Sequence, residues 1–85
     1  MKKVQLFIQA RCPFCVKALR YIEDAKQQNE ELKGIEIEIH DEILEPDFAD
    51  TFDYYYVPTL FIDGEKVHEG AIYEDEIVPL LKRAL

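Results

Sequence analysis

Two cysteines are the residues with the clearest chemical potential in this sequence, because they stand in the tetrad Cys12-Pro13-Phe14-Cys15. The chain contains no other cysteine. A disulfide that closes so small a loop stabilises a fold by only about 2 kcal/mol before strain is counted, which makes a purely structural role a poor explanation. Two neighbouring thiols can instead exchange with the disulfide of another molecule. We therefore expect reversible thiol–disulfide chemistry at this tetrad.

The tetrad is predicted to lie where a strand ends and a helix begins. Residues 3–9 form a nearly continuous apolar run, which is typical of a strand covered on both faces. Residues 13–31 carry apolar side chains at helical spacing, and Pro13 suits the first turn of a helix. The unpaired N–H groups and the positive end of the helix favour a thiolate at Cys12. The adjacent Arg11 adds positive charge in the same place.

The two cysteines are expected to have different roles. Cys12 is nearer the end of the helix and is predicted to be the more exposed, whereas Cys15 falls on the apolar stripe. We expect Cys12 to attack a substrate disulfide and Cys15 to resolve the mixed disulfide that forms. The neighbouring residues Arg11, Pro13 and Phe14 are predicted to border the substrate, with Pro13 stiffening the loop and Phe14 offering an apolar contact.

The two thiols have other possible uses. A structural zinc site needs four ligands and this tetrad supplies two, while His40 and His68 are isolated in the sequence, so no metal site is predicted. Two inert core cysteines fit poorly with a proline between them at a strand-to-helix junction. The alternative function that remains is a non-catalytic module whose thiols hold a metal, such as an iron–sulfur cluster shared between two chains.

The remaining sequence predicts an α/β domain that spans residues 1–85. Further strands are expected at residues 35–40, 59–63 and 66–69, a short helix within 45–54, and a final helix at 73–84. Gly34 is expected to end the first helix, Asp63-Gly64-Glu65-Lys66 to form the turn of a hairpin, and Pro79 to bend the last helix. The order β-α-β-α-β-β-α predicts a four-stranded mixed sheet with helices on both faces.

Three alternating isoleucines define the second strand. Ile35, Ile37 and Ile39 alternate with polar residues, which predicts an edge strand with one buried face and one solvated face.

In the final helix four apolar residues are expected to face inward: Ile77, Leu80, Leu81 and Ala84.

The net charge and the apolar content of the chain argue against some classes of binding partner. The 85 residues carry a net charge of −8, which repels phosphate backbones and argues against nucleic-acid binding. No apolar run reaches the roughly 18 residues of a membrane span, so no membrane partner is expected. The absence of other cysteines and of a signal peptide favours a reducing compartment, the cytoplasm. We expect a monomer.

Together these features resemble the thioredoxin superfamily in its small, glutaredoxin-sized form. The resemblance is carried by Cys12-Pro13-Phe14-Cys15 after a strand, by Val57-Pro58-Thr59 before the third strand, and by Phe61-Ile62-Asp63-Gly64 at the hairpin. It implies a thioredoxin-like fold and a thiol–disulfide oxidoreductase that reduces protein disulfides. It also implies that the Val57-Pro58 bond is cis and faces the tetrad, with the backbone of Val57 exposed to an extended substrate.

The sequence departs from both branches of the superfamily. Where glutaredoxins usually have a Gly-Gly pair that helps to hold glutathione, this chain has His68 and Glu69. Where thioredoxins carry a buried aspartate in the first strand, this chain has Leu6. No tightly bound cofactor is expected. The electron source is either glutathione or a thioredoxin-reductase-type flavoenzyme, and the missing Gly-Gly pair favours the reductase.

Two further segments have open interpretations. Tyr54-Tyr55-Tyr56 precedes the proline loop and forms either an aromatic rim for a substrate or part of the packing, with at least one tyrosine expected to pack. The acidic residues that follow the second strand are expected to form a solvated face, with selection of basic partners as the alternative: Asp41, Glu42, Glu45, Asp47 and Asp50.

Overall fold

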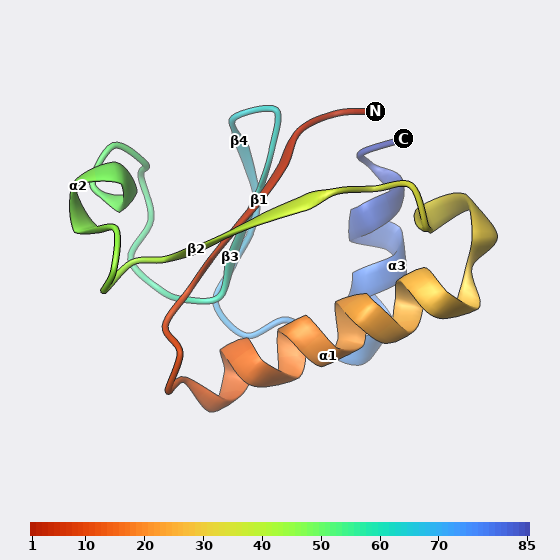
Figure 1. The fold of residues 1–85 in the computed structure, drawn as a ribbon, viewed down its shortest axis with the longest axis horizontal. Coiled ribbons are helices and arrows are strands. Elements are labelled where there is room, and N and C mark those ends of the chain that lie inside the picture. The colour runs from red at the N-terminus through yellow and green to blue at the C-terminus, as the bar shows by residue number, and fades with distance from the viewer.

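The computed structural model describes residues 1–85 and has the predicted order of elements (Figure 1). The strands are β1 (Val4–Ile8), β2 (Ile37–Asp41), β3 (Thr59–Ile62) and β4 (Glu65–Glu69). The α-helices are α1 (Pro13–Gln28), α2 (Pro46–Ala49) and α3 (Glu74–Lys82), and a short 3-10 helix, η1 (Glu30–Leu32), follows α1.

The four strands form one mixed sheet in the order β2-β1-β3-β4. β1 pairs with β2 in parallel through the crossover helix α1, and it pairs with β3 in the antiparallel sense. The hairpin then places β4 at the far edge. Since β1 is central and covered on both faces, all five of its residues are buried, as its continuous apolar run predicts.

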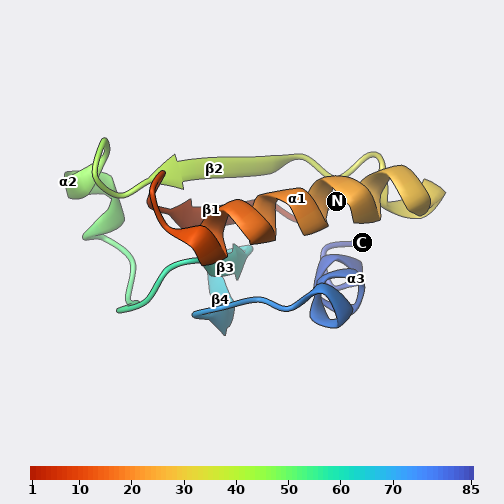
Figure 2. The same ribbon diagram turned by 90° about the horizontal axis from the view of Figure 1, so that it is seen from below.

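The two faces of the sheet have different cores. On one face, aliphatic residues of β1 and β3 pack with α1 and α3. On the other face, Phe7 and Phe61 pack with Ala49 of α2 and with the segment that follows it. Figure 1 shows α1 running across the lower part of the view past α3, and α2 at the opposite end of the molecule from α3. The two termini lie side by side in Figures 1 and 2, and the Lys2 N–H donates to the Ala84 carbonyl at 2.9 Å.

The first helix ends earlier than predicted. It stops at Gln28, and the Asn29 side-chain amide donates to the Ala25 carbonyl at 2.9 Å, satisfying a group at the helix end. The chain then continues as η1, so Gly34 does not terminate α1. Asparagine competes well for free backbone groups at helix ends, which accounts for the earlier stop.

The edge strand β2 is less well covered than its alternation predicts. Ile35 is buried but precedes the strand, whereas Ile39 is 50% exposed. β2 lies at the edge of the sheet, where α1 covers only part of its inward face. The edge position is thus confirmed, and the prediction that Ile39 is buried is wrong.

The hairpin turn is tighter than the predicted four residues. Asp63 has φ 49° and Gly64 has φ 80°, the positive values that a two-residue hairpin turn requires, so β4 begins at Glu65. The register then shifts, because Leu60 pairs with His68 whereas Phe61 pairs with Lys66. Val67 is therefore an extra residue, a β-bulge in the edge strand.

The last helix is α3, with Pro79 inside it. The four residues predicted to face inward are all buried, although the helix ends at Lys82 and Ala84 lies beyond it. Its first turn is held by the Tyr73 N–H, which donates to the Glu76 carboxylate at 3.0 Å. None of the helices has the length and apolar character needed to cross a lipid bilayer.

Candidate thiol site

Cys12 occupies the junction between β1 and α1. It is the N-cap residue of α1, with an extended backbone, and it is half-buried. Its N–H donates to the Gln9 carbonyl at 3.1 Å, and its own carbonyl accepts the N–H of Val16 at 3.1 Å. The sulfur therefore lies at the positive end of a 16-residue helix, where a negative charge is stabilised.

Cys15 lies one turn further along α1, on the face that packs against the sheet. It is 1% exposed and belongs to the aliphatic core. The pKa of the Cys15 thiol is raised to about 12, mainly by burial and further by the neighbouring Cys12 and the more distant Glu42 carboxylate, while the Gln9 backbone N–H opposes the shift. Cys15 is consequently a protonated thiol at neutral pH. Both cysteines are free in this structure.

The Val57-Pro58 segment closes the site from the other side. The peptide bond is cis, as the family resemblance implies. The Val57 carbonyl oxygen lies 4.0 Å from the Cys12 sulfur, although the two residues are 45 positions apart in the chain. The N–H of Val57 has no acceptor within the chain. Val57 is half-buried while Pro58 is buried, so the loop presents a free backbone edge beside Cys12.

The other residues predicted for the site surround Cys12 on the surface. Arg11, Pro13 and Phe14 are all exposed, with Phe14 47% exposed. The Lys17 ammonium lies 5.8 Å from the centre of the Phe14 ring, within the range of a cation–π contact. The structure thus brings all the predicted site residues to one region, at the N-terminus of α1.

A polar network beside the cysteines was not predicted from the sequence. The Glu42 carboxylate accepts hydrogen bonds from the Gln9 side-chain amide and, at 2.8 Å, from the Tyr54 hydroxyl. Burial and the Glu42 carboxylate raise the pKa of that hydroxyl. Glu42 is half-buried, which differs from the solvated face expected for the acidic run. The signal was available, because Glu42 directly follows β2 and the ends of parallel strands meet at one edge of the sheet.

The three consecutive tyrosines divide between packing and exposure. Tyr54 packs on the aromatic face of the sheet, with its ring centre 5.1 Å from that of Phe7. Tyr55 is 86% exposed and Tyr56 is 71% exposed. At least one tyrosine therefore packs, as predicted, and two remain on the surface next to Val57.

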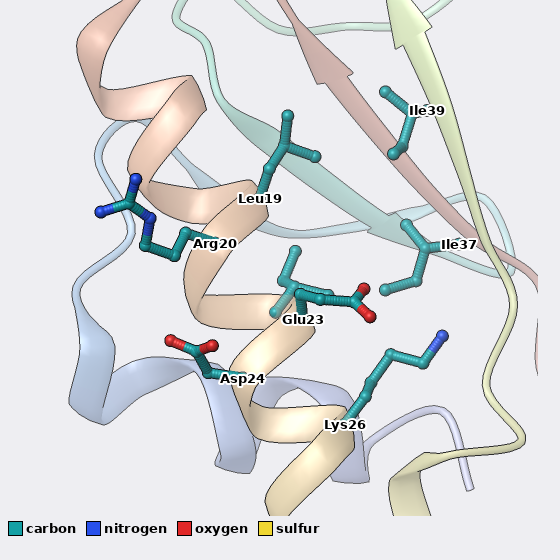
Figure 3. A pocket seen from close by; sticks show the side chains of 8 residues that line it. Leu19, Arg20, Glu23, Asp24, Lys26, Ile37 and Ile39 are labelled. Atoms are coloured by element: carbon teal, nitrogen blue, oxygen red, sulfur yellow. The ribbon is translucent and has the colours of Figure 1, made fainter.

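The largest hollow on the surface lies away from the thiols. It is a groove of about 560 Å³ between α1 and β2, and neither cysteine lines it. Figure 3 shows Leu19 of α1 facing Ile37 and Ile39 of β2 across the groove, with charged side chains along α1.

The possible metal ligands do not converge. No group of three or more His, Cys, Asp or Glu side chains is placed to hold a metal ion. His40 contacts Glu38 and Glu45, and His68 contacts Glu76 at 3.1 Å. Within one chain the tetrad supplies two sulfur ligands, so the alternative metal-binding function requires ligands from a second chain.

Comparison with known proteins identifies the family. The family model for the thioredoxin domain matches residues 2–82. A thioredoxin of Methanocaldococcus jannaschii is 30% identical over 83 residues, covering 98% of this chain and 95% of that protein. The crystal structure of a mutant thioredoxin-like protein shares the fold, with a TM-score of 0.59 at 22% identity over 96% of this chain and 97% of the other. This chain therefore belongs to the thioredoxin superfamily, as a thioredoxin-domain protein.

Proposed function

We propose that this protein is a thiol–disulfide oxidoreductase that reduces protein disulfides by dithiol exchange. The observation that carries the proposal is the asymmetry of the two thiols. Cys12 is half-buried at a helix N-terminus and reachable from solvent, whereas Cys15 is 1% exposed and protonated at neutral pH. One thiol is thus suited to attack and the other to wait until an intermediate forms beside it.

The reaction balances in two exchange steps. The Cys12 thiolate attacks one sulfur of the substrate disulfide, and the other substrate sulfur leaves as a thiolate and takes up a proton. Cys15 then loses its proton and attacks the Cys12 sulfur, which forms the Cys12–Cys15 disulfide and releases the second substrate thiol. Two electrons have passed to the substrate, and a two-electron donor must reduce the protein again.

The backbone of Val57 supports binding of an extended protein segment. Its N–H is free, and its carbonyl oxygen lies 4.0 Å from the attacking sulfur. An extended segment pairing with these groups in the manner of an added strand would carry its cysteine to Cys12. Phe14, Arg11 and Pro13 border the same opening and offer side-chain contacts.

For the electron donor we propose a thioredoxin-reductase-type flavoenzyme rather than glutathione. The support is at Glu69, which stands where glutaredoxins carry a glycine, because a fixed carboxylate there disfavours the carboxylates of glutathione. The test is to mix the oxidised protein with millimolar glutathione alone. Slow or incomplete reduction is expected, and rapid, complete reduction would overturn this choice of donor.

Two serine variants test the dithiol mechanism. Cys12→Ser is expected to abolish reduction of a protein disulfide such as that of insulin, since it removes the attacking sulfur. Cys15→Ser is expected to accumulate a mixed disulfide between Cys12 and the substrate, visible on a non-reducing gel. Normal turnover by Cys15→Ser would refute the dithiol mechanism. A metal-bound or coloured dimer that lacks reductase activity would instead favour the metal-binding alternative.

A further inference from the structure

The loop before Pro58 is tied down by two charged residues of β4. The Glu69 carboxylate accepts the N–H groups of Tyr55 at 2.5 Å and of Tyr56 at 3.0 Å. The Lys66 ammonium bonds the same carboxylate at 2.7 Å and the Asp53 carbonyl at 3.2 Å. We call the pair Lys66 and Glu69 the latch, because together they hold three backbone groups of the segment 53–56.

The β-bulge at Val67 makes this pairing geometrically available. In a regular strand, residues three positions apart point to opposite faces of the sheet. Lys66 and Glu69 are three positions apart, yet their side chains form an ion pair. The extra residue at Val67 turns the two side chains to the same side. Bulges near active sites commonly re-aim a side chain in this way.

In the loop from Tyr55 to Pro58, one residue has a backbone N–H with no hydrogen-bond acceptor. It is Val57, the residue beside the Cys12 sulfur. Tyr55 and Tyr56 have their N–H groups bound to Glu69, the Tyr56 carbonyl accepts the Thr59 hydroxyl, and the Pro58 carbonyl accepts the Gly70 N–H at 2.9 Å. Within the loop from Tyr55 to Pro58, Val57 alone keeps a free N–H, and its carbonyl faces Cys12.

The latch carries full charge across the physiological range. The Lys66 ammonium, followed by the two backbone N–H groups, lowers the pKa of the Glu69 carboxyl to about 2. The same carboxylate raises the pKa of Lys66. The hydrogen bonds to Tyr55 and Tyr56 are therefore charge-assisted, which is the stronger class.

We propose that Glu69 is a positioning residue that holds the loop from Tyr55 to Pro58 in the conformation that docks a protein substrate at Val57. The inference rests on the proposed function, because it assigns a residue that prepares the substrate dock. A loop ordered before binding loses less conformational freedom on binding, so the latch increases affinity without touching the reacting sulfurs. The rings of Tyr55 and Tyr56 are held in solvent beside the dock and are placed to contact the same substrate.

Kinetics of a Glu69→Ala variant test the proposal. We expect the KM for a protein disulfide to rise about tenfold with kcat changed less than about twofold, because positioning affects docking more than chemistry. Glu69→Gln keeps an oxygen acceptor and is expected to recover part of the loss. The matched control is Glu65→Ala, which removes the same charge from the same strand at a residue that contacts Arg83, away from the loop. Its KM is expected to equal that of the wild type.

Amide hydrogen exchange provides a readout that does not depend on activity. In the wild type the N–H groups of Tyr55 and Tyr56 are expected to exchange slowly, and in Glu69→Ala about tenfold faster or more, while those of β1 stay unchanged. An unchanged KM or unchanged exchange in Glu69→Ala would overturn the latch, as would an equal rise of KM in Glu65→Ala. If the wild type shows the predicted exchange pattern but no activity on protein disulfides, the proposed function is overturned, and the docking role of Glu69 with it. The two hydrogen bonds from Tyr55 and Tyr56 would still be demonstrated.

Discussion

The second exchange step should become faster as the pH rises. Cys15 must lose its proton to attack Cys12, and burial raises the pKa of its thiol to about 12. At pH 7 only a small fraction of Cys15 is therefore the thiolate, and burial, the largest cause of the raised pKa, persists when Cys12 is held in a mixed disulfide. Below the pKa the thiolate fraction rises about tenfold with each pH unit. The rate of resolution is therefore predicted to rise about tenfold per pH unit between pH 7 and 9.

The assay isolates this step in a single turnover. Cys12 is first joined to a chromophoric aromatic thiol, and release of that thiol by Cys15 is followed by its absorbance in a stopped-flow instrument across the pH range. Cys15→Ser is the control and should release nothing by the intramolecular route. A resolution rate that stays constant from pH 7 to 9 would refute the reasoning, because it would mean that a neighbouring group removes the proton from Cys15.

Two further predictions concern stability. Phe7 is fully buried and packs against several aromatic rings. Phe7→Ala should therefore lower the free energy of unfolding, measured by urea titration, by about 3–5 kcal/mol. A loss below about 1 kcal/mol would contradict this packing. The pKa of Glu69 is lowered from 4.5 to about 2, so its stabilising contribution is present above pH 4.5 and is lost as the pH falls towards 2. The stability of Glu69→Gln relative to the wild type should accordingly rise on acidification over that range, and a constant difference in their unfolding curves would argue against the latch.

The sequence predicts the parts of the fold that depend on local patterns. Each of these patterns depends only on residues that are close together in the sequence. They are the apolar run of β1, the helical spacing that follows Cys15 and the Asp63-Gly64 turn, and the structure confirms all three elements. The exposure of Ile39 was not predictable, since it depends on how far α1 extends over an edge strand.

The thiol pair could also be located from the sequence, because both cysteines lie in one tetrad. The residues that support it are not marked by a motif of this kind, and finding them requires the pairing of the strands. Glu42 reads as one member of an acidic run, and only the pairing of β2 with β1 brings it to Gln9 and Tyr54. From the sequence, Glu69 looks like an ordinary charged residue of an edge strand. Its pairing with Lys66 depends on the β-bulge at Val67, and a bulge cannot be inferred from the alternation of side chains alone.

The most direct test of the account maps the disulfides during one turnover. The reduced protein is mixed with an excess of a protein disulfide, quenched with acid, alkylated and analysed by mass spectrometry. Dithiol exchange predicts that each substrate disulfide reduced yields one Cys12–Cys15 disulfide, and that every trapped mixed disulfide contains Cys12. Substrate reduction without the Cys12–Cys15 bond, or mixed disulfides that contain Cys15, would contradict it.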